Sequence, residues 1–256
     1  MRSPLRDPNK FKSAHVVREM TPSSAVICSY LFFDGAIELS LIDSERFVVA
    51  HTNNYTVSEF WACARFDPHR LSQLIKHINS NTEEKLIYAM QENWAKYKDP
   101  FVRSAIFYLL NRYSGTSQIS AGPIEFEKVN PVSLNHIKSL KKIKNFHLNR
   151  TKSEDFLLDI EQSSSEINND MILIPVGNFN YNLFDKGKST SHEATAINHG
   201  DLADVFRSLK KKSVMIYKNH RELYDLYKTN NLTMVDTRGN KTTDHERCED
   251  LIIANF

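Results

Sequence analysis

One group of residues whose charge and spacing could bind a ligand is a run of lysines, Lys138, Lys141, Lys142 and Lys144. Ammonium groups at this spacing suit contact with nucleic-acid phosphates, and such binding falls steeply as the salt concentration rises. A solvated helix face is the default interpretation of the same pattern. The spacing alone leaves both interpretations open.

The histidines predict no metal site. No HxxxH or HExxH spacing brings two imidazoles to one face of a helix. His199 and His220 are isolated in the sequence, and no GxSxG turn accompanies the serines as it would in a hydrolase. We therefore expect neither a metalloenzyme nor a hydrolase of that type.

The composition is that of an ordinary globular protein and not of a polycation. The 256 residues include 33 Lys+Arg and 31 Asp+Glu, a formal charge of +2, so a nucleic-acid surface would require local clustering of charge. Cys28, Cys63 and Cys248 show no paired spacing, which argues against a disulfide framework and a structural zinc site. The first residues lack the apolar stretch of a signal peptide, and no run approaches the ~18 apolar residues of a membrane span. We expect a soluble, intracellular protein.

The elements that must position these residues begin with a β-turn-α-β pattern. The apolar run 25–33 predicts a buried strand, residues 34–36 a turn, 37–42 a helix and 47–50 a second strand. Such an opening is typical of a doubly wound sheet.

A block of helices follows, predicted at 56–66, 68–79, 82–97 and 100–113. Asp67 and Asp99 are good N-caps for two of them, and Pro68 and Pro100 stand where a helix needs no N–H donor.

Strand signals then resume, at 146–148, 171–175, 213–217, 232–235 and 250–254. Helices are expected at 153–161, where Ser153 would be the cap, and at 201–212 and 220–228, with a long polar loop at 177–199. We expect an α/β protein in which residues 1–53 and 132–256 form a Rossmann-like core and residues 54–131 an inserted helical domain.

The segment from Asp99 to Tyr113, DPFVRSA continuing to LNRY, resembles the helix that leads into the target-recognition loop of Dam-type adenine-specific DNA methyltransferases. Residues 32–50 can be laid without a gap on that family's cofactor loop, helix and second strand. Residues 171–175 fall where its catalytic strand ends, and the C-terminal GNKTTDHERCEDLIIANF is similar to its last hairpin. The resemblance implies an S-adenosylmethionine-dependent methyltransferase core with a target-recognition-like helical insertion.

The sequence departs from this family at the cofactor site. The family's loop reads F-x-G-x-G, whereas this chain has Phe32, then Asp34, Gly35 and Ala36 at the last three places. A Cβ there hinders close approach of the backbone to the ligand. The family's acidic ribose ligand is replaced by His51, which cannot accept two hydrogen bonds. The resemblance therefore implies a degenerate site, and we expect no cofactor.

The catalytic motif also differs. The family's DPPY orients and stacks the flipped adenine, and the matching residues here are Pro175, Val176, Gly177, Asn178 and Phe179. No acceptor side chain stands at the first position. A shifted but working site using Asn178 or Asn180 is the alternative, and it would require S-adenosylmethionine.

The resemblance also implies candidate DNA contacts. They are Asn111 and Arg112, in the helix that leads into the family's target-recognition loop, and Arg238 and Lys241, in the hairpin that lies near DNA in the family. The four lysines of the run are candidates from their charge pattern alone. For the lysine run, a phosphate-binding patch and a solvated helix face both remain open.

Taken together, the residues and the resemblance lead to three hypotheses. The first is a catalytically inactive Dam-like homologue, a pseudoenzyme that binds DNA or scaffolds a protein partner such as an active subunit or a viral assembly. The second is an active adenine methyltransferase with a non-standard motif. The third is a purely structural component of a virion or another complex. By resemblance to phage-borne genes, the host cytoplasm or a virion is the expected location.

Overall fold

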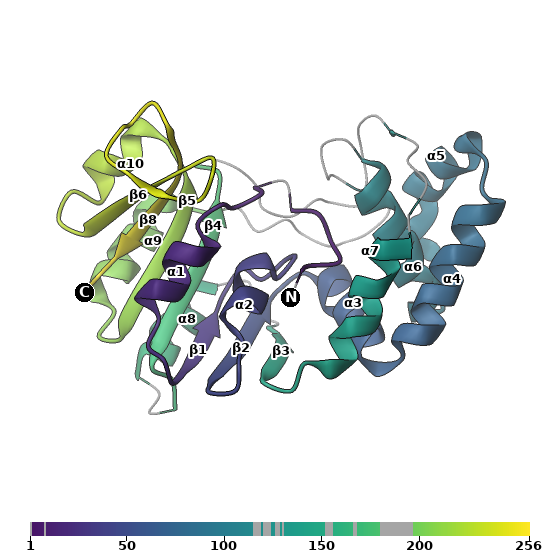
Figure 1. Ribbon diagram of the computed structural model, residues 1–256, viewed down its shortest axis with the longest axis horizontal. Coiled ribbons are helices and arrows are strands. Elements are labelled where there is room, and N and C mark those ends of the chain that lie inside the picture. Colours follow the sequence, from purple (N-terminus) through teal and green to yellow (C-terminus); the bar gives the residue numbers. More distant parts are fainter. Residues whose placement is uncertain are drawn as a thin grey trace. The chain divides into compact units, whose positions relative to one another are not determined.

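The computed structural model describes residues 2–7, 9–114, 119, 124–125, 129, 131–151, 156–165, 168–179 and 197–256. They form two compact units, drawn in Figure 1. The sheet unit holds the described residues of Asn9–Asn53, Asn145–Leu183 and Thr195–Phe256, and the helical unit those of Met1–Pro8 and Asn54–Lys144. Three features expected above, the Ser153 cap, Asn180 and most of the loop 177–199, lie outside the described residues.

The sheet unit is built on one sheet, whose described strands run in the order β3-β2-β1-β4-β5-β8-β6-β7. Its strands are β1 Ala25–Ser29, β2 Arg46–Thr52, β3 Phe146–Arg150, β4 Met171–Gly177, β5 Lys212–Lys218, β6 Asn231–Asp236, β7 Lys241–Thr242 and β8 Cys248–Ala254. Neighbours from β3 through β5 are parallel, and β8 pairs antiparallel with both β5 and β6. The order reverses beside β1, which is the switch point of a doubly wound sheet. This arrangement confirms the expected α/β class and Rossmann-like core.

Helices cover both faces of this sheet. They are α1 Ala14–Met20, α2 Ala36–Leu41, α8 Phe156–Ser165, α9 His199–Ser208 and α10 Arg221–Leu226. The crossover from β1 to β2 runs in the direction opposite to those from β3 to β4 and from β4 to β5. Because such crossovers are right-handed, α2 lies on one face and α8 and α9 on the other. The contacts agree, since α1 packs with α2 and α8 with α9 (Figure 1).

Most strand boundaries differ by a few residues from the sequence-based expectation, and the differences at β1 and β2 lie beside the candidate site. The strand expected at 25–33 ends at Ser29, because Leu31 has a left-handed backbone with φ 56° that a regular strand does not tolerate. The strand expected at 47–50 instead continues to Thr52, whose carbonyl accepts a hydrogen bond from Thr151 N at 3.0 Å. His51 therefore lies inside β2 and not in the loop after it.

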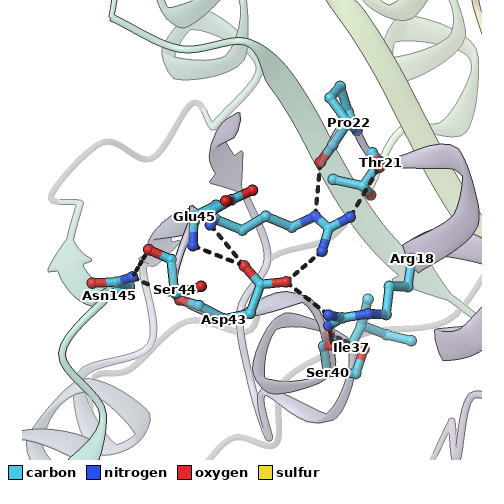
Figure 2. Close-up of polar contacts among 10 residues, drawn as sticks. Arg18, Thr21, Pro22, Ile37, Ser40, Asp43, Ser44, Glu45 and Asn145 are labelled. Carbon is cyan, nitrogen blue, oxygen red and sulfur yellow. Dashed lines mark hydrogen bonds and ion pairs between the residues drawn. The ribbon is translucent and has the colours of Figure 1, made fainter. Parts of the chain in front are cut away.

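A polar network fixes the loop between α2 and β2 (Figure 2). The Asp43 carboxylate accepts from the backbone N–H of Glu45 at 3.0 Å and of Arg46 at 2.9 Å. It also pairs with the guanidinium groups of Arg18 on α1, at 2.7 Å, and of Arg46, at 2.5 Å. Asn145 Nδ2 donates to the Asp43 carbonyl at 2.7 Å. The Arg46 N–H, then the Glu45 N–H and the Arg46 guanidinium, lower the pKa of Asp43 to about 2. The bonds to Arg18 and Asn145 join α1 to the start of β3.

The helical unit confirms the expected block of helices. It contains α3 Tyr55–Phe66, α4 Pro68–Asn81, α5 Glu84–Asn93, η1 Trp94–Lys96, α6 Pro100–Tyr113, α7 Pro131–Ser139 and η2 Leu140–Lys142. The caps act as expected: Asp67 accepts from Arg70 N at 2.9 Å, and Asp99 from Phe101 N at 2.7 Å. Phe60 and Trp61 of α3 are fully buried, and Phe60 stacks on Tyr108 of α6.

The units divide at a different residue from the one expected. We expected the core to resume at residue 132, whereas the structure assigns residues up to Lys144 to the helical unit. The reason is that α7 packs on α4, and η2 on α3. The lysine run of α7 and η2 is therefore part of the helical unit.

Candidate functional site

The switch point directs attention to the carboxyl ends of β1, β2 and β4. In doubly wound sheets ligands bind outside these ends. The segment after β1 adjoins both neighbouring strands there, since Phe32 N donates to His51 O of β2 at 3.0 Å and Tyr30 N to Leu173 O of β4 at 2.9 Å. The structure thus brings together the cofactor-loop residues and His51.

In the loop after β1, the side chain of Asp34 bonds to the backbone of the same loop. Asp34 is 8% exposed, and its Oδ1 accepts from Ala36 N at 2.9 Å. Gly35 has φ 74°, a left-handed conformation that glycine adopts without strain, and it is the N-cap of α2. The Asp34 carboxylate therefore occupies the first free N–H of the helix, a group that a glycine-rich loop would offer to an anionic ligand.

Aromatic rings fill the space beside this loop. Phe32 is fully buried and packs on Phe146 of β3, with 5.5 Å between ring centres. Tyr30 stacks on His51 at 4.9 Å, and its hydroxyl donates to the Asp159 carbonyl of α8 at 3.0 Å. Phe32 is thus a core residue, and Tyr30 is directed to α8.

The end of β2 has no carboxylate. Ala50 is fully buried and is followed by His51 and then Thr52. Burial, aided by the charge of His147, lowers the pKa of His51 to about 4. His51 is therefore neutral at pH 7, and a neutral imidazole has one acceptor nitrogen where two ribose hydroxyls would require two.

The end of β4 is covered by a residue that the sequence did not single out. Gly177 has φ 89°, and a Cβ placed on it would lie 2.4 Å from Oδ1 of Asn9. Asn178 Nδ2 donates to the same Asn9 oxygen at 3.3 Å. The N-terminal segment therefore lies against the place of the DPPY motif. No local pattern marks Asn9, because its partner is far away in sequence.

Phe179 follows and is stacked against two imidazoles. Its ring centre lies 4.6 Å from that of His199 and 4.8 Å from that of His220. His199 Nδ1 lies 3.0 Å from the Tyr217 hydroxyl, and burial lowers the pKa of His199. Stacking uses the face of a ring, so these histidines occupy the surface that Phe179 would offer to a base.

The same N-terminal segment is fastened to the last strands. Asp250 of β8 is fully buried, and its Oδ2 accepts from Ser13 N at 2.8 Å as well as from Lys12 N. Its Oδ1 pairs with Lys218 Nζ at 2.6 Å. A buried carboxylate with these partners holds the start of α1 at the carboxyl end of β5.

The candidate DNA contacts fall into different environments. Asn111 is fully buried, and it accepts from Arg6 N at 2.8 Å and donates to Arg6 O at 2.9 Å. Arg112 Nη2 donates to Pro4 O at 2.7 Å. This pair therefore fastens the first residues of the chain to α6, and the expectation that Asn111 contacts DNA is not compatible with its burial.

The remaining candidates are on the surface. All four lysines of the run, Lys138, Lys141, Lys142 and Lys144, are exposed. Arg238 and Lys241 are exposed in the sheet unit, where Lys241 pairs with Glu19 at 2.9 Å. The structure thus assigns the four lysines to the helical unit, and Arg238 and Lys241 to the sheet unit.

The described residues carry few features of other site classes. Cys28, Cys63 and Cys248 are buried, and none of these three is in a disulfide bond. Within the described ranges, His, Cys, Asp and Glu side chains form no group of three suited to a metal ion. None of the described helices is long and apolar enough to cross a bilayer.

Comparison with known proteins gives structural likenesses alone. No protein family model and no curated protein matches the sequence. A TehB-like S-adenosylmethionine-dependent methyltransferase from Corynebacterium glutamicum ATCC 13032 Kitasato is 10% identical, with a TM-score of 0.40 over 96% of this chain and 87% of that chain. An S-adenosylmethionine-dependent methyltransferase from Agrobacterium tumefaciens is 9% identical, with a TM-score of 0.40 over 94% of this chain and 58% of that chain. Neither likeness assigns a residue or an activity, and the Rossmann-like core of this chain rests on its own strand order.

Proposed function

We propose that this chain is a methyltransferase-like protein without methyl-transfer activity, and that its surfaces bind DNA or a protein partner. The observation that carries the proposal is the chemistry at the carboxyl ends of the strands. The groups that would hold S-adenosylmethionine and orient adenine are replaced by side chains that bond to the protein itself.

The residues present do not fit the cofactor as the resembled family binds it. Asp34 places a carboxylate over the N-terminus of α2 and uses the Ala36 N–H. His51 is neutral and stacked on Tyr30. A sulfonium donor with a ribose finds neither a free loop backbone nor a bidentate acceptor among these groups. We therefore derive no reaction step through it.

The residues at the place of the DPPY motif, which would bind the flipped base, support the same proposal. Gly177 stands at the end of β4 with the Asn9 side chain against it. Phe179 is stacked on His199 and His220. A flipped base needs an acceptor for its amino group and a free ring face. The neighbours of Gly177 and Phe179 leave little of either.

The direct test is calorimetric titration of the full chain with S-adenosylmethionine, followed by incubation of the chain with DNA and radiolabelled cofactor. An established adenine methyltransferase serves as the positive control. We expect no heat of binding and no label on adenine. Micromolar affinity with label transfer would contradict the proposal and favour the active-enzyme alternative. In that case Asn178→Ala should abolish the transfer, because Asn178 carries the side-chain amide within the segment that matches the motif.

A gel-shift titration separates DNA from a protein partner. The double variant Lys141→Glu, Lys142→Glu reverses two exposed charges of the helical unit, and Arg238→Glu, Lys241→Glu does so in the sheet unit. If DNA is the ligand, wild-type binding falls steeply with salt, and the variant at the contact surface weakens it. Absence of a shift at low salt would instead favour a protein partner or a structural component.

A further inference from the structure

Residues 9–13, which we call the N-terminal arm, cover the carboxyl end of β4 in the sheet unit. Asn9 is 7% exposed, and a Cβ placed on Gly177 would lie 2.4 Å from its Oδ1. Asn178 Nδ2 donates to the same oxygen at 3.3 Å. In doubly wound sheets ligands bind outside such strand ends. The arm therefore occupies a position at which this fold can bind a ligand.

One end of the arm is firmly anchored. Lys12 N and Ser13 N both donate to Oδ2 of Asp250, the second at 2.8 Å, and Asp250 and Ser13 are fully buried. A Cβ placed on Gly239, in the turn between β6 and β7, would lie 2.9 Å from Lys12 O, so this turn packs directly on the backbone of the arm. Hydrogen bonds to a buried carboxylate are strong, because the acceptor is charged. We therefore expect residues 12–13 to stay in place as long as the sheet is folded.

The other end of the arm carries backbone strain. Lys10 has φ 48°, in the left-handed region. A residue with a Cβ adopts this conformation at a cost that disfavours the closed arm by about fivefold. The Lys10 side chain is exposed, so burial of that side chain does not offset the cost. Release of Asn9 and Lys10 from the sheet removes the strain and keeps both bonds to Asp250.

We propose that the arm is an autoinhibitory segment. Residues 9–11 move away from the end of β4 while residues 12–13 stay fixed, and the site at that strand end is accessible only in this open state. A ligand there must compete with the Asn9 side chain, so its apparent affinity is reduced to the extent that the arm is closed. The inference goes beyond the proposed function, since opening of the arm requires neither S-adenosylmethionine nor a partner.

Thiol labelling of the full chain tests the proposal. Asn9→Cys places a thiol at the end that opens, and Ser13→Cys places the matched thiol at the anchored end; both positions are buried in the closed arm. The wild-type chain, with buried Cys28, Cys63 and Cys248, gives the baseline. Each rate is divided by the rate in the urea-unfolded chain. We expect labelling at position 9 to be at least about tenfold faster than at position 13, because local opening requires less free energy than unfolding of the sheet.

The contribution of strain is measured within the Asn9→Cys chain, because that substitution itself removes the contact with Asn178. Adding Lys10→Gly should slow labelling at position 9 by about fivefold, since glycine adopts a φ of 48° without strain. Lys12→Gly is the matched control. Lys12 does not have a positive φ, so glycine there relieves no strain and should not slow the labelling. Circular dichroism verifies that each variant is folded.

Two results would overturn the proposal. Equal labelling rates at positions 9 and 13 would show that the arm leaves the sheet only when the sheet unfolds. Labelling that Lys10→Gly fails to slow would show that strain at Lys10 does not oppose the closed state. Neither result bears on the loss of methyl transfer, which the titration with S-adenosylmethionine tests separately.

Discussion

Asn111 offers the sharpest test of the structure, because the resemblance would place it at DNA and the structure buries it. Its side-chain amide makes two hydrogen bonds to the backbone of Arg6, of 2.8 and 2.9 Å. A buried neutral hydrogen bond contributes about 1 kcal/mol, so Asn111→Ala should lower the free energy of unfolding by about 2 kcal/mol. Removal of buried side-chain atoms adds to that loss.

The assay can be confined to the helical unit. The chain has two tryptophans, Trp61 and Trp94, and both are buried in this unit. Urea unfolding followed by tryptophan fluorescence therefore reports on the unit that contains Asn111. Its midpoint should fall in Asn111→Ala with little change in the slope.

The control removes the partner instead of the side chain. In a chain lacking residues 2–6, Asn111 has lost both bonds to Arg6, so Asn111→Ala should then cost little. This non-additivity is the signature of a direct interaction. The reasoning is refuted if Asn111→Ala matches the wild type in the full chain. An equal cost in the full and shortened chains would refute it too.

Three further predictions concern packing and charge. Gly177→Ala should destabilise the sheet unit by about 2 kcal/mol or more, since φ is 89° and the new Cβ meets Asn9. Circular dichroism during denaturation measures this loss. Adding Asn9→Ala should recover the part of the loss that comes from the clash, whereas the part that comes from backbone strain should remain. The pKa of Asp43 is lowered from 3.8 to about 2, so its carboxylate contributes stability above pH 3.8 that is lost as the pH falls through 2. Asp43→Asn should therefore reduce the fall in the free energy of unfolding between these pH values. An unchanged fall would exclude Asp43 as its source. Arg103 and Glu59 form an ion pair with side-chain exposures of 13% and 11%. Arg103→Met should therefore lower the free energy of unfolding, measured by urea denaturation, by about 3 kcal/mol, and the double variant with Glu59→Met should lower it much less. Equal losses in the single and double variants would show that the pair is not coupled.

Local sequence determined most of the elements of this protein. Asp67 and Asp99 begin helices as expected, because an N-cap bonds to N–H groups two or three residues away. The buried strands were also predictable, since continuous apolar runs between turns identify a strand covered on both faces. The departures from the resembled family at Asp34 and His51 could be read from residue types alone.

The tertiary structure decided which partners those residues meet. Asn9 reaches Gly177, and Asn111 reaches Arg6, over more than a hundred residues of sequence. Neither contact leaves a periodic or local signal, because it depends on how distant segments pack. The sequence therefore suggested Asn111 as a surface contact, whereas in the structure its buried side chain bonds to Arg6. The sequence determined the types of groups available, and long-range packing decided which of them remain free to bind a ligand.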